Sequence, residues 1–185
     1  LVGDSNSGKT QLLISYMKNF FPDEGIMNNF ENYTINVKVD EKSYNLQLFD
    51  ADSQEDKKNA RQLIYPQADI FIVCFSLVSP QSLENVETIW LPEINQICQN
   101  KPFILSGVKS VLRDKYPERV EEFEKNGWVP VPTEKGEAMK TKVGALDYVE
   151  CGPKNGFNVK EVIESAIKAL KSSKEEAEEN QNEGH

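Results

Sequence analysis

Histidine, paired cysteine and long apolar runs are scarce in this chain of 185 residues. Its single histidine is His185, so no internal histidine is present for a Ser-His-Asp type of triad. The cysteines Cys74, Cys98 and Cys151 are widely spaced without a CxxC pair, which argues against a zinc site and favours buried thiols in a reduced, cytoplasmic compartment. The longest apolar run, 70–75, is far shorter than a membrane-spanning helix requires, and no secretory leader opens the chain, so we expect a soluble protein.

Positive charge is also in deficit, because 21 Lys and Arg face 30 Asp and Glu for a net charge of −9. Such a chain repels phosphate backbones, so no nucleic-acid partner is expected. Residues 173–185 hold five of the glutamates against one lysine, and this composition predicts a disordered acidic tail. Residues 1–172 show no repeat or linker and suit one domain.

Hydrophobic periodicity predicts the class of fold. Apolar and polar residues alternate over 34–39 and 44–49, which indicates a β-hairpin with its turn at 40–42. Continuous apolar runs at 70–75 and 103–105 are typical of strands buried on both faces. Helical patterns follow at 82–97, 117–125, 133–142 and 159–172. We therefore expect an α/β fold with a doubly wound, mostly parallel sheet and a ligand at the carboxyl ends of its strands.

The first ten residues carry the clearest motif. Residues 3–10, GDSNSGKT, satisfy G-x-x-x-x-G-K-[ST] and lie between a strand remnant, Leu1-Val2, and a helical stretch. Because the strand begins without an initiator Met, we expect the chain to be trimmed at this end. In such loops backbone N–H groups cradle an anion, the lysine neutralises phosphate and the hydroxyl ligates Mg²⁺. The predicted phosphate-binding residues are Gly3, Asp4, Ser5, Asn6, Ser7, Gly8, Lys9, Thr10 and Gln11.

A longer stretch extends this interpretation. Residues 65–80, YPQADIFIVCFSLVSP, together with 82–94, resemble the Rho family of Ras-like small GTPases, and the resemblance covers nearly the whole chain. It implies a Ras-like P-loop G domain over 1–172, with a six-stranded sheet and a Rho-type insert helix at 115–125 packed through Val120 and Phe123. It also implies GTP/GDP and Mg²⁺ as cofactors, a monomer, and effector proteins, exchange factors or GDP-dissociation-inhibitor-like regulators as partners, with actin regulation as the usual output.

The segments that would respond to nucleotide depart from the family pattern. Phe30-Glu31-Asn32-Tyr33 resembles the end of switch I, with Asn28 in place of the Mg²⁺-binding threonine. In switch II the family's Asp-x-x-Gly-Gln reads as residues 50–54, DADSQ. The resemblance assigns Asp50 to Mg²⁺ and Gln54, with Lys9, to catalysis. Ser53 replaces the glycine that would meet the γ-phosphate and Asp52 adds negative charge, so weak coupling of switch II, which includes Glu55, is expected.

The base-recognition segments depart further. Val111 stands where the family has the aspartate that accepts two hydrogen bonds from guanine, which predicts an affinity loss of roughly 10²–10⁴. The Ser-Ala-[KL] loop reads Gly152-Pro153-Lys154, and Pro153 has no N–H to donate. Lys109 and Phe21 are kept and would cover the base.

Three hypotheses follow. The first is a divergent Rho-type switch with slow or deficient hydrolysis, because Ser5 would crowd the attacking water, as in the Rnd branch with its similar loop. The second is a pseudo-GTPase scaffold that binds partners without nucleotide control. The third is relaxed selectivity, with ATP accepted beside GTP. The last four residues offer no prenylation cysteine, so no membrane anchor is expected in this chain.

Overall fold

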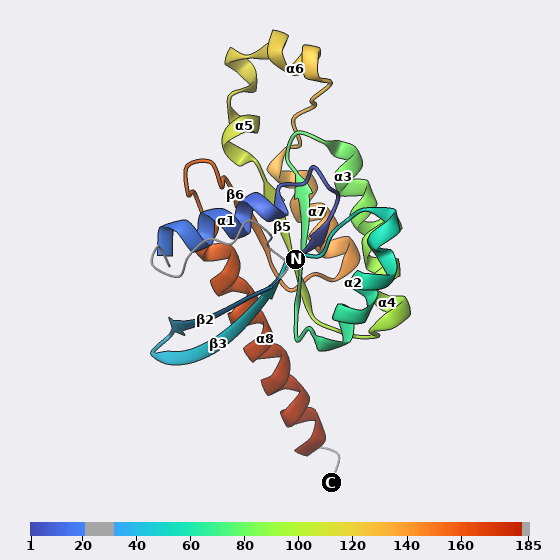
Figure 1. The fold of residues 1–185 in the computed structure, drawn as a ribbon, viewed down its shortest axis with the longest axis vertical. Helices are drawn as coiled ribbons and strands as arrows, with labels where there is room; N and C mark the ends of the chain where they lie inside the picture. Colours follow the sequence, from blue (N-terminus) through green and yellow to red (C-terminus); the bar gives the residue numbers. More distant parts are fainter. Residues whose placement is uncertain (21–31, 183–185) are drawn as a thin grey trace.

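The computed structural model describes residues 1–20 and 32–182, and its ribbon is an α/β domain with a long C-terminal helix (Figure 1). The predicted hairpin is confirmed as β2 (Asn32–Val39) paired antiparallel to β3 (Lys42–Phe49). Its turn residues Asp40 and Glu41 have φ angles of 49° and 63°. Positive φ at both positions suits a two-residue turn that matches the right-handed twist of the strands.

The central sheet is parallel and has the order β1-β4-β5-β6. Its strands are β1 (Val2–Gly3), β4 (Phe71–Ser76), β5 (Phe103–Val108) and β6 (Tyr148–Cys151). One six-stranded sheet was expected, but the six strands of the described residues form a sheet of four and a sheet of two. The two sheets are separate because Val2–Gly3 pairs with β4, while the hydrogen bonds toward β3 come from Leu1: its nitrogen donates to the Phe49 oxygen at 2.7 Å, and its oxygen accepts from the Ala51 nitrogen at 3.1 Å.

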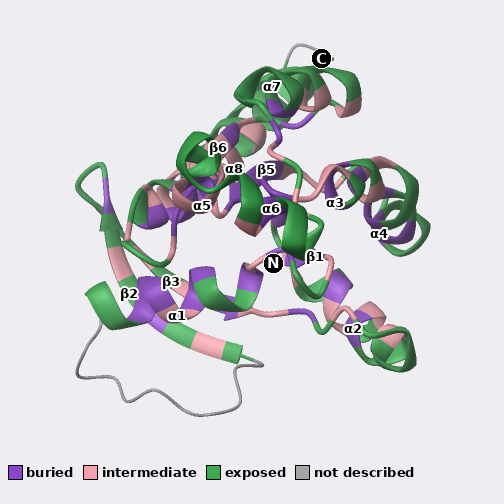
Figure 2. Ribbon diagram, turned by 90° about the horizontal axis from the view of Figure 1, so that it is seen from above, coloured by how far each residue is buried: buried purple, intermediate pink, exposed green. Residues whose placement is uncertain are grey.

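Helices cover both faces of the parallel sheet (Figures 1 and 2). The α-helices are α1 (Lys9–Phe20), α2 (Lys58–Ile64), α3 (Pro80–Asn85), α4 (Leu91–Ile97), α5 (Ser110–Asp114), α6 (Val120–Asn126), α7 (Thr133–Val143) and α8 (Val159–Asn182). A π-helical turn, Val86–Trp90, joins α3 to α4, so the predicted helix at 82–97 is present as one run with a local irregularity.

The protein has one hydrophobic core on each face of the parallel sheet, and side chains that alternate along β4 contribute to both. Phe71, Val73 and Phe75 pack with residues of α3, α4 and α7 on one face. Ile72 and Cys74 pack on the other face with residues of α1, α8 and the hairpin. Because successive side chains of a strand point to opposite faces, a continuous apolar run fills both layers.

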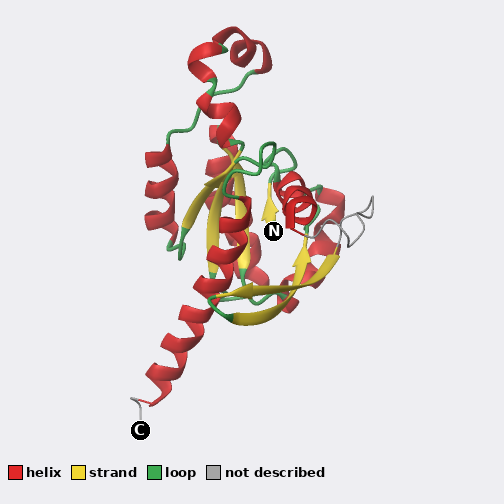
Figure 3. Cartoon of the chain, turned by 90° about the vertical axis from the view of Figure 1, so that its left-hand side faces the viewer, coloured by secondary structure: helices red, strands yellow, loops and turns green. Residues whose placement is uncertain are grey.

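The C-terminal segment corrects the expectation of a disordered tail. Helix α8 continues to Asn182, beyond the predicted end at 172, and its last part projects away from the domain (Figure 3). Its first half is anchored by buried residues that include Val162 and Ile163, which supplies the costly helix nucleus. The following Lys, Glu and Ala residues are good helix formers and extend it. No helix in the described part of the chain has both the length and the apolar content needed to cross a bilayer.

The expected insert region is helical and projects from the opposite end of the molecule (Figure 1). Residues 115–125 comprise a 3₁₀ turn at Tyr116–Glu118 and most of α6, and α5 precedes them. Phe123 is fully buried, with its ring 5.1 Å from Tyr116 and 5.5 Å from Trp128, so its predicted packing role is confirmed. Val120 is 38% exposed, so the same expectation is wrong for that residue, which lies on the solvent side of this short helix.

The cysteines are free and buried, as predicted for Cys74 and Cys151. Burial raises the pKa of each of these two thiols from 9.0 to about 12. The unfolded chain releases both protons near pH 9 whereas the fold retains them, so stability should fall as the pH rises from about 9 toward 12. We expect a loss of about 1.4 kcal/mol per thiol at pH 10, measured by urea unfolding at pH 8 and pH 10. A Cys74→Ala/Cys151→Ala variant should lose less over the same interval, and an equal loss would contradict this origin.

Candidate nucleotide-binding site

The phosphate motif forms the loop between β1 and α1. Gly3 has φ 153°, and a Cβ there would lie 2.2 Å from the Cys74 carbonyl oxygen. Gly8 has φ 96°, and a Cβ there would lie 2.7 Å from Val108 Cγ1. Both positions therefore require glycine, because the loop adopts left-handed backbone angles while it packs against β4 and β5. The bond from Ser7 N–H to the Asp4 carbonyl, at 3.0 Å, closes the turn before α1 begins.

Lys9, the first residue of α1, is only 4% exposed. Its Nζ donates to the Asp4 carbonyl over 3.4 Å, a long hydrogen bond for a charged group. A buried ammonium is costly unless an opposite charge or several acceptors compensate it. The surroundings of Lys9 therefore suit an anion at the N-terminus of a 12-residue helix.

Oxygen atoms gather beside this lysine. The Thr10 hydroxyl donates to Oδ2 of Asp50, which follows β3. Asp50 Oδ1 and Ser7 Oγ are buried, and within residues 1–20 and 32–182 no hydrogen-bond partner reaches either atom. Hydroxyl and carboxylate oxygens are the ligands that Mg²⁺ prefers, so these orphaned atoms fit a metal–phosphate group. Among the described residues no group of three His, Cys, Asp or Glu forms a metal site, so phosphate oxygens and water would supply the other ligands.

Asp4 is fixed by two side chains that the sequence did not single out as site residues. Trp90 Nε1 donates to its Oδ1 at 2.7 Å, and Asn85 Nδ2 donates to its Oδ2 at 2.8 Å. We interpreted Trp90 as a packing residue, and it does belong to the core, with 4% of its surface exposed. A sequence signal for its second role was available, because a buried indole N–H needs an acceptor.

The segment after β5 approaches the same loop. Lys109 has a left-handed backbone with φ 72°, and its Nζ donates to the Asn6 carbonyl at 2.6 Å. Desolvation by burial lowers the pKa of Lys109. The structure thus brings Lys109 to the phosphate loop, where its aliphatic stem can flank a base.

Val111 and Gly152 are coupled by packing. A Cβ at residue 152 would lie 2.5 Å from Val111 Cγ2, so the valine is accommodated because residue 152 is glycine. The Gly152 N–H is taken by the Phe157 carbonyl at 2.8 Å, and the Asn155 N–H is taken by the Gly152 carbonyl at 3.2 Å. Pro153 has no N–H, and Lys154 is exposed. At the corner expected to recognise the base edge, Val111 therefore lies beside Ser110 Oγ and Asn155 Oδ1, and the N–H groups of Gly152 and Asn155 already have acceptors within the protein.

The loop after Asp50 is held by hydrogen bonds to groups of the protein itself. The Gln54 N–H donates to Asp52 Oδ1 at 3.0 Å, and its carbonyl accepts from Arg61 Nη1 at 2.7 Å. The Gln54 residue is exposed, Ser53 is half-buried, and Glu55 is exposed at the start of a 3₁₀ turn.

Of the segment expected to be switch I, the described residues are Asn32 and Tyr33 at its end. Asn32 and Tyr33 open β2, where Asn32 is exposed and accepts from Gln47 Nε2 at 3.2 Å. Gln11 is exposed on α1. The predictions for Phe21, Asn28, Phe30 and Glu31 lie outside the described residues.

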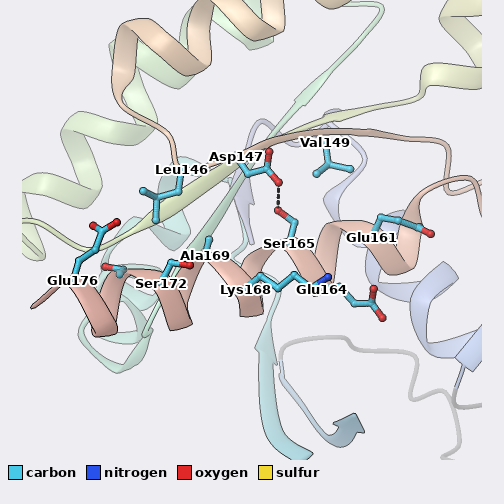
Figure 4. Close-up of a pocket in the computed structure, with 11 residues that line it drawn as sticks. Leu146, Asp147, Val149, Glu161, Glu164, Ser165, Lys168, Ala169, Ser172 and Glu176 are labelled. Atoms are coloured by element: carbon cyan, nitrogen blue, oxygen red, sulfur yellow. Dashed lines mark hydrogen bonds between the residues drawn. The ribbon is translucent and has the colours of Figure 1, made fainter. Parts of the chain in front are cut away.

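Two hollows lie elsewhere. One of about 600 Å³ is bounded by β3, β4 and α8. The other, of about 530 Å³, runs along α8, where Ser165 donates to Asp147 at 2.5 Å (Figure 4). Carboxylates of Glu161, Glu164 and Glu176 also line this second hollow, so it repels anions and does not suit a nucleotide phosphate.

Residues 1–172 match the family model described as Ras family, which leaves the projecting end of α8 outside the match.

Proposed function

The chain belongs to the Ras family, and we propose that it acts as a divergent Rho-type small GTPase, a switch that binds guanine nucleotide and Mg²⁺ and hydrolyses GTP slowly or not at all. Small GTPases of this family bind nucleotide at a phosphate loop. The observation that supports the proposal most is the assembly of that loop in this chain, with buried Lys9 beside the Thr10–Asp50 pair and two orphaned oxygen atoms.

The residues divide the work of binding as follows. Loop N–H groups and Lys9 would hold the β- and γ-phosphates, while Thr10 and Asp50 would hold Mg²⁺, the latter through water. Bound Mg²⁺ supplies positive charge that offsets the phosphate oxygens. Lys109 would flank the base through its stem. The glycines at 3 and 8 let the backbone approach the phosphates closely.

Slow hydrolysis rests on two residues. Ser5 is exposed in the phosphate loop, where its side chain would occupy space needed by an attacking water or an arginine finger. Gln54, which would orient that water, has its backbone held by Asp52 and Arg61. We propose a cytoplasmic monomer whose Asn32, Tyr33 and helical segment 115–125, as a Rho-type insert, contact effectors that regulate actin.

Lys9→Ala should weaken GTP binding about 10²–10⁴-fold, because it removes two charge-assisted phosphate contacts worth about 1.5–3 kcal/mol each. Titration calorimetry of the nucleotide-free protein with Mg²⁺ and GTP measures this loss. The matched control is Lys18→Ala, which removes an exposed lysine from the last turn of the same helix. Equal affinities for wild type and Lys9→Ala would contradict the phosphate site.

The rival function is a scaffold of the pseudo-GTPase type, and valine at 111 in place of a guanine-binding carboxylate favours it. Denaturing the purified protein and identifying released nucleotide by ion-exchange chromatography separates the two. Near-stoichiometric GTP would support a slow or locked switch, whereas GDP would indicate working hydrolysis despite Ser5 and Ser53. Protein that is empty and also fails to bind GTP in calorimetry would support the scaffold.

A further inference from the structure

A buried ionic cluster lies between α2 and the helical run 80–97. Arg61 is 2% exposed, and its Nε and Nη2 donate to the two carboxylate oxygens of Glu93 at 2.8 Å each. The Tyr65 hydroxyl donates to the same carboxylate at 2.7 Å. Burial works against the charge of Glu93, but the hydrogen bonds from Arg61 and Tyr65 outweigh it and lower the pKa of this carboxyl. The two-pronged contact also fixes the plane of the guanidinium.

The remaining arm of that guanidinium reaches the loop after β3. Arg61 Nη1 donates to the carbonyl oxygens of Gln54, at 2.7 Å, and Asp52, at 3.3 Å. Since the Gln54 N–H is bound to the Asp52 side chain, both backbone polar groups of Gln54 have protein partners. The loop is thus anchored to α4 through Arg61 and Glu93.

Trp90 connects this anchor to the phosphate loop. The Arg61 guanidinium carbon lies 5.3 Å from the centre of the Trp90 ring, within cation–π range, and the indole N–H donates to Asp4. Asn85, the second donor to Asp4, is five residues before Trp90. A π-helical turn, with its i to i+5 bonding, brings residues at that spacing to one side, where both meet the carboxylate.

We propose that Arg61 and Trp90 are positioning residues that tie the loop 52–54 to the phosphate loop. As a result, the loop 52–54 keeps the same conformation whether a nucleoside diphosphate or a nucleoside triphosphate is bound. This inference rests on the proposed function. A γ-phosphate can move this loop only if the triphosphate binds more tightly to one conformation of the loop than to another. Moving it here would leave Nη1 of the buried Arg61 without its two carbonyl acceptors, while Nε and Nη2 stay bound to Glu93. Proteins that contact this loop therefore bind both nucleotide states alike.

Two variants distinguish the tie between the two loops from a general effect on the stability of the fold. Arg61→Lys keeps a positive charge for Glu93, but a lysine lacks the planar fork and does not hold Glu93 and two loop carbonyls together. Trp90→Phe keeps a ring for packing and for the cation, and removes the N–H that binds Asp4. Trp128→Phe is the matched control, because it removes an indole from the 110–128 region, and it leaves Trp90 as the sole tryptophan for fluorescence.

The experiment is amide hydrogen exchange over residues 51–57 and 4–8, with Trp90 emission in the Trp128→Phe background. Wild-type exchange and emission should be the same with GDP and with a non-hydrolysable GTP analogue. Arg61→Lys should speed exchange at 51–57 by about tenfold or more and make it differ between the nucleotides, and Trp90→Phe should do the same at 4–8. Trp128→Phe should change neither segment.

A difference between the two nucleotides in the 51–57 amides of the wild type, or in the Trp90 emission of Trp128→Phe, would overturn the proposal. So would an Arg61→Lys protein that melts at the wild-type temperature with unchanged exchange. If calorimetry shows that wild type binds neither nucleotide, the proposed function fails. The tie between the loops is then judged from nucleotide-free protein, where the two variants should still speed exchange.

Discussion

Glu93→Ala should lower the free energy of unfolding by about 3–5 kcal/mol, because it leaves the buried Arg61 guanidinium without its charged partner. The side chains of this pair are only 2% and 6% exposed, so water cannot replace the carboxylate without opening the packing of α2 against α4. Tyr65 would lose the acceptor of its hydroxyl as well. Urea unfolding at pH 7 measures the loss.

A surface ion pair provides the control for burial. Lys142 and Glu87 are 2.7 Å apart, but their side chains are 62% and 40% exposed. Glu87→Ala should cost less than about 1 kcal/mol, since exposed pairs contribute little. An Arg61→Met/Glu93→Leu variant should recover most of the loss, because apolar side chains of similar volume commonly replace a buried ion pair without penalty. Equal losses for Glu93→Ala and Glu87→Ala would contradict the argument from burial.

The pH dependence gives the same pair a second signature. The pKa of Glu93 is lower in the fold than its ordinary value of 4.5. The pair therefore contributes its full stability above about pH 4.5, and this contribution is lost as the pH falls through the folded pKa. Glu93→Ala should flatten the acid limb of the stability profile, which unfolding curves between pH 3 and pH 6 measure.

The parts of this molecule that could be predicted from sequence are those in which local pattern decides the structure. Alternation gave the hairpin, the run at 70–75 gave a strand buried on both faces, and the glycines and lysine of residues 3–10 indicated the phosphate loop. Each depends on neighbours within a few residues. The helical end of α8 could not be predicted from charge composition alone, because the preceding, buried part of the helix supplies the nucleus that extends it.

The contacts that could not be predicted join residues that are remote in sequence. Trp90 lies 86 residues from Asp4, and Glu93 lies 32 residues from Arg61. Nothing in the spacing of such residues indicates which pairs will meet, because residues so far apart in the sequence come together only in the complete fold. The division of the sheet has a similar origin, because β1 pairs with β4 while the hydrogen bonds toward β3 come from Leu1, which precedes the strand.

The base corner shows how two departures from a family pattern can be one structural change. Val111 and Gly152 looked like separate losses in sequence, but a side chain at 152 would overlap the valine. The valine at 111 and the glycine at 152 therefore form one structural change. Valine at 111 cannot accept the N1 and N2 hydrogens of guanine as a carboxylate would, so the wild-type protein should prefer GTP over ATP by less than about tenfold.

Val111→Asp should raise the preference for GTP over ATP to about 10²–10⁴-fold, because it adds two charge-assisted hydrogen bonds of about 1.5–3 kcal/mol each. Aspartate branches one atom further from the backbone than valine, so its carboxylate extends beyond the position of the valine methyls, and the glycine at 152 leaves it room. Competition of GTP, ITP and ATP against a fluorescent nucleotide measures the preference, and ITP tests the N2 contact because it lacks that amine.

Val111→Asn is the matched control, since it keeps the shape without the charge and should gain much less. Gly152→Ala should weaken binding of all three nucleotides together, because its Cβ would lie 2.5 Å from Val111 Cγ2 and push the corner apart. A wild-type protein that already prefers GTP a hundredfold would show that the base is recognised elsewhere. Unchanged selectivity in Val111→Asp would show that the base does not lie against residue 111, in which case affinity here comes from the phosphate loop alone.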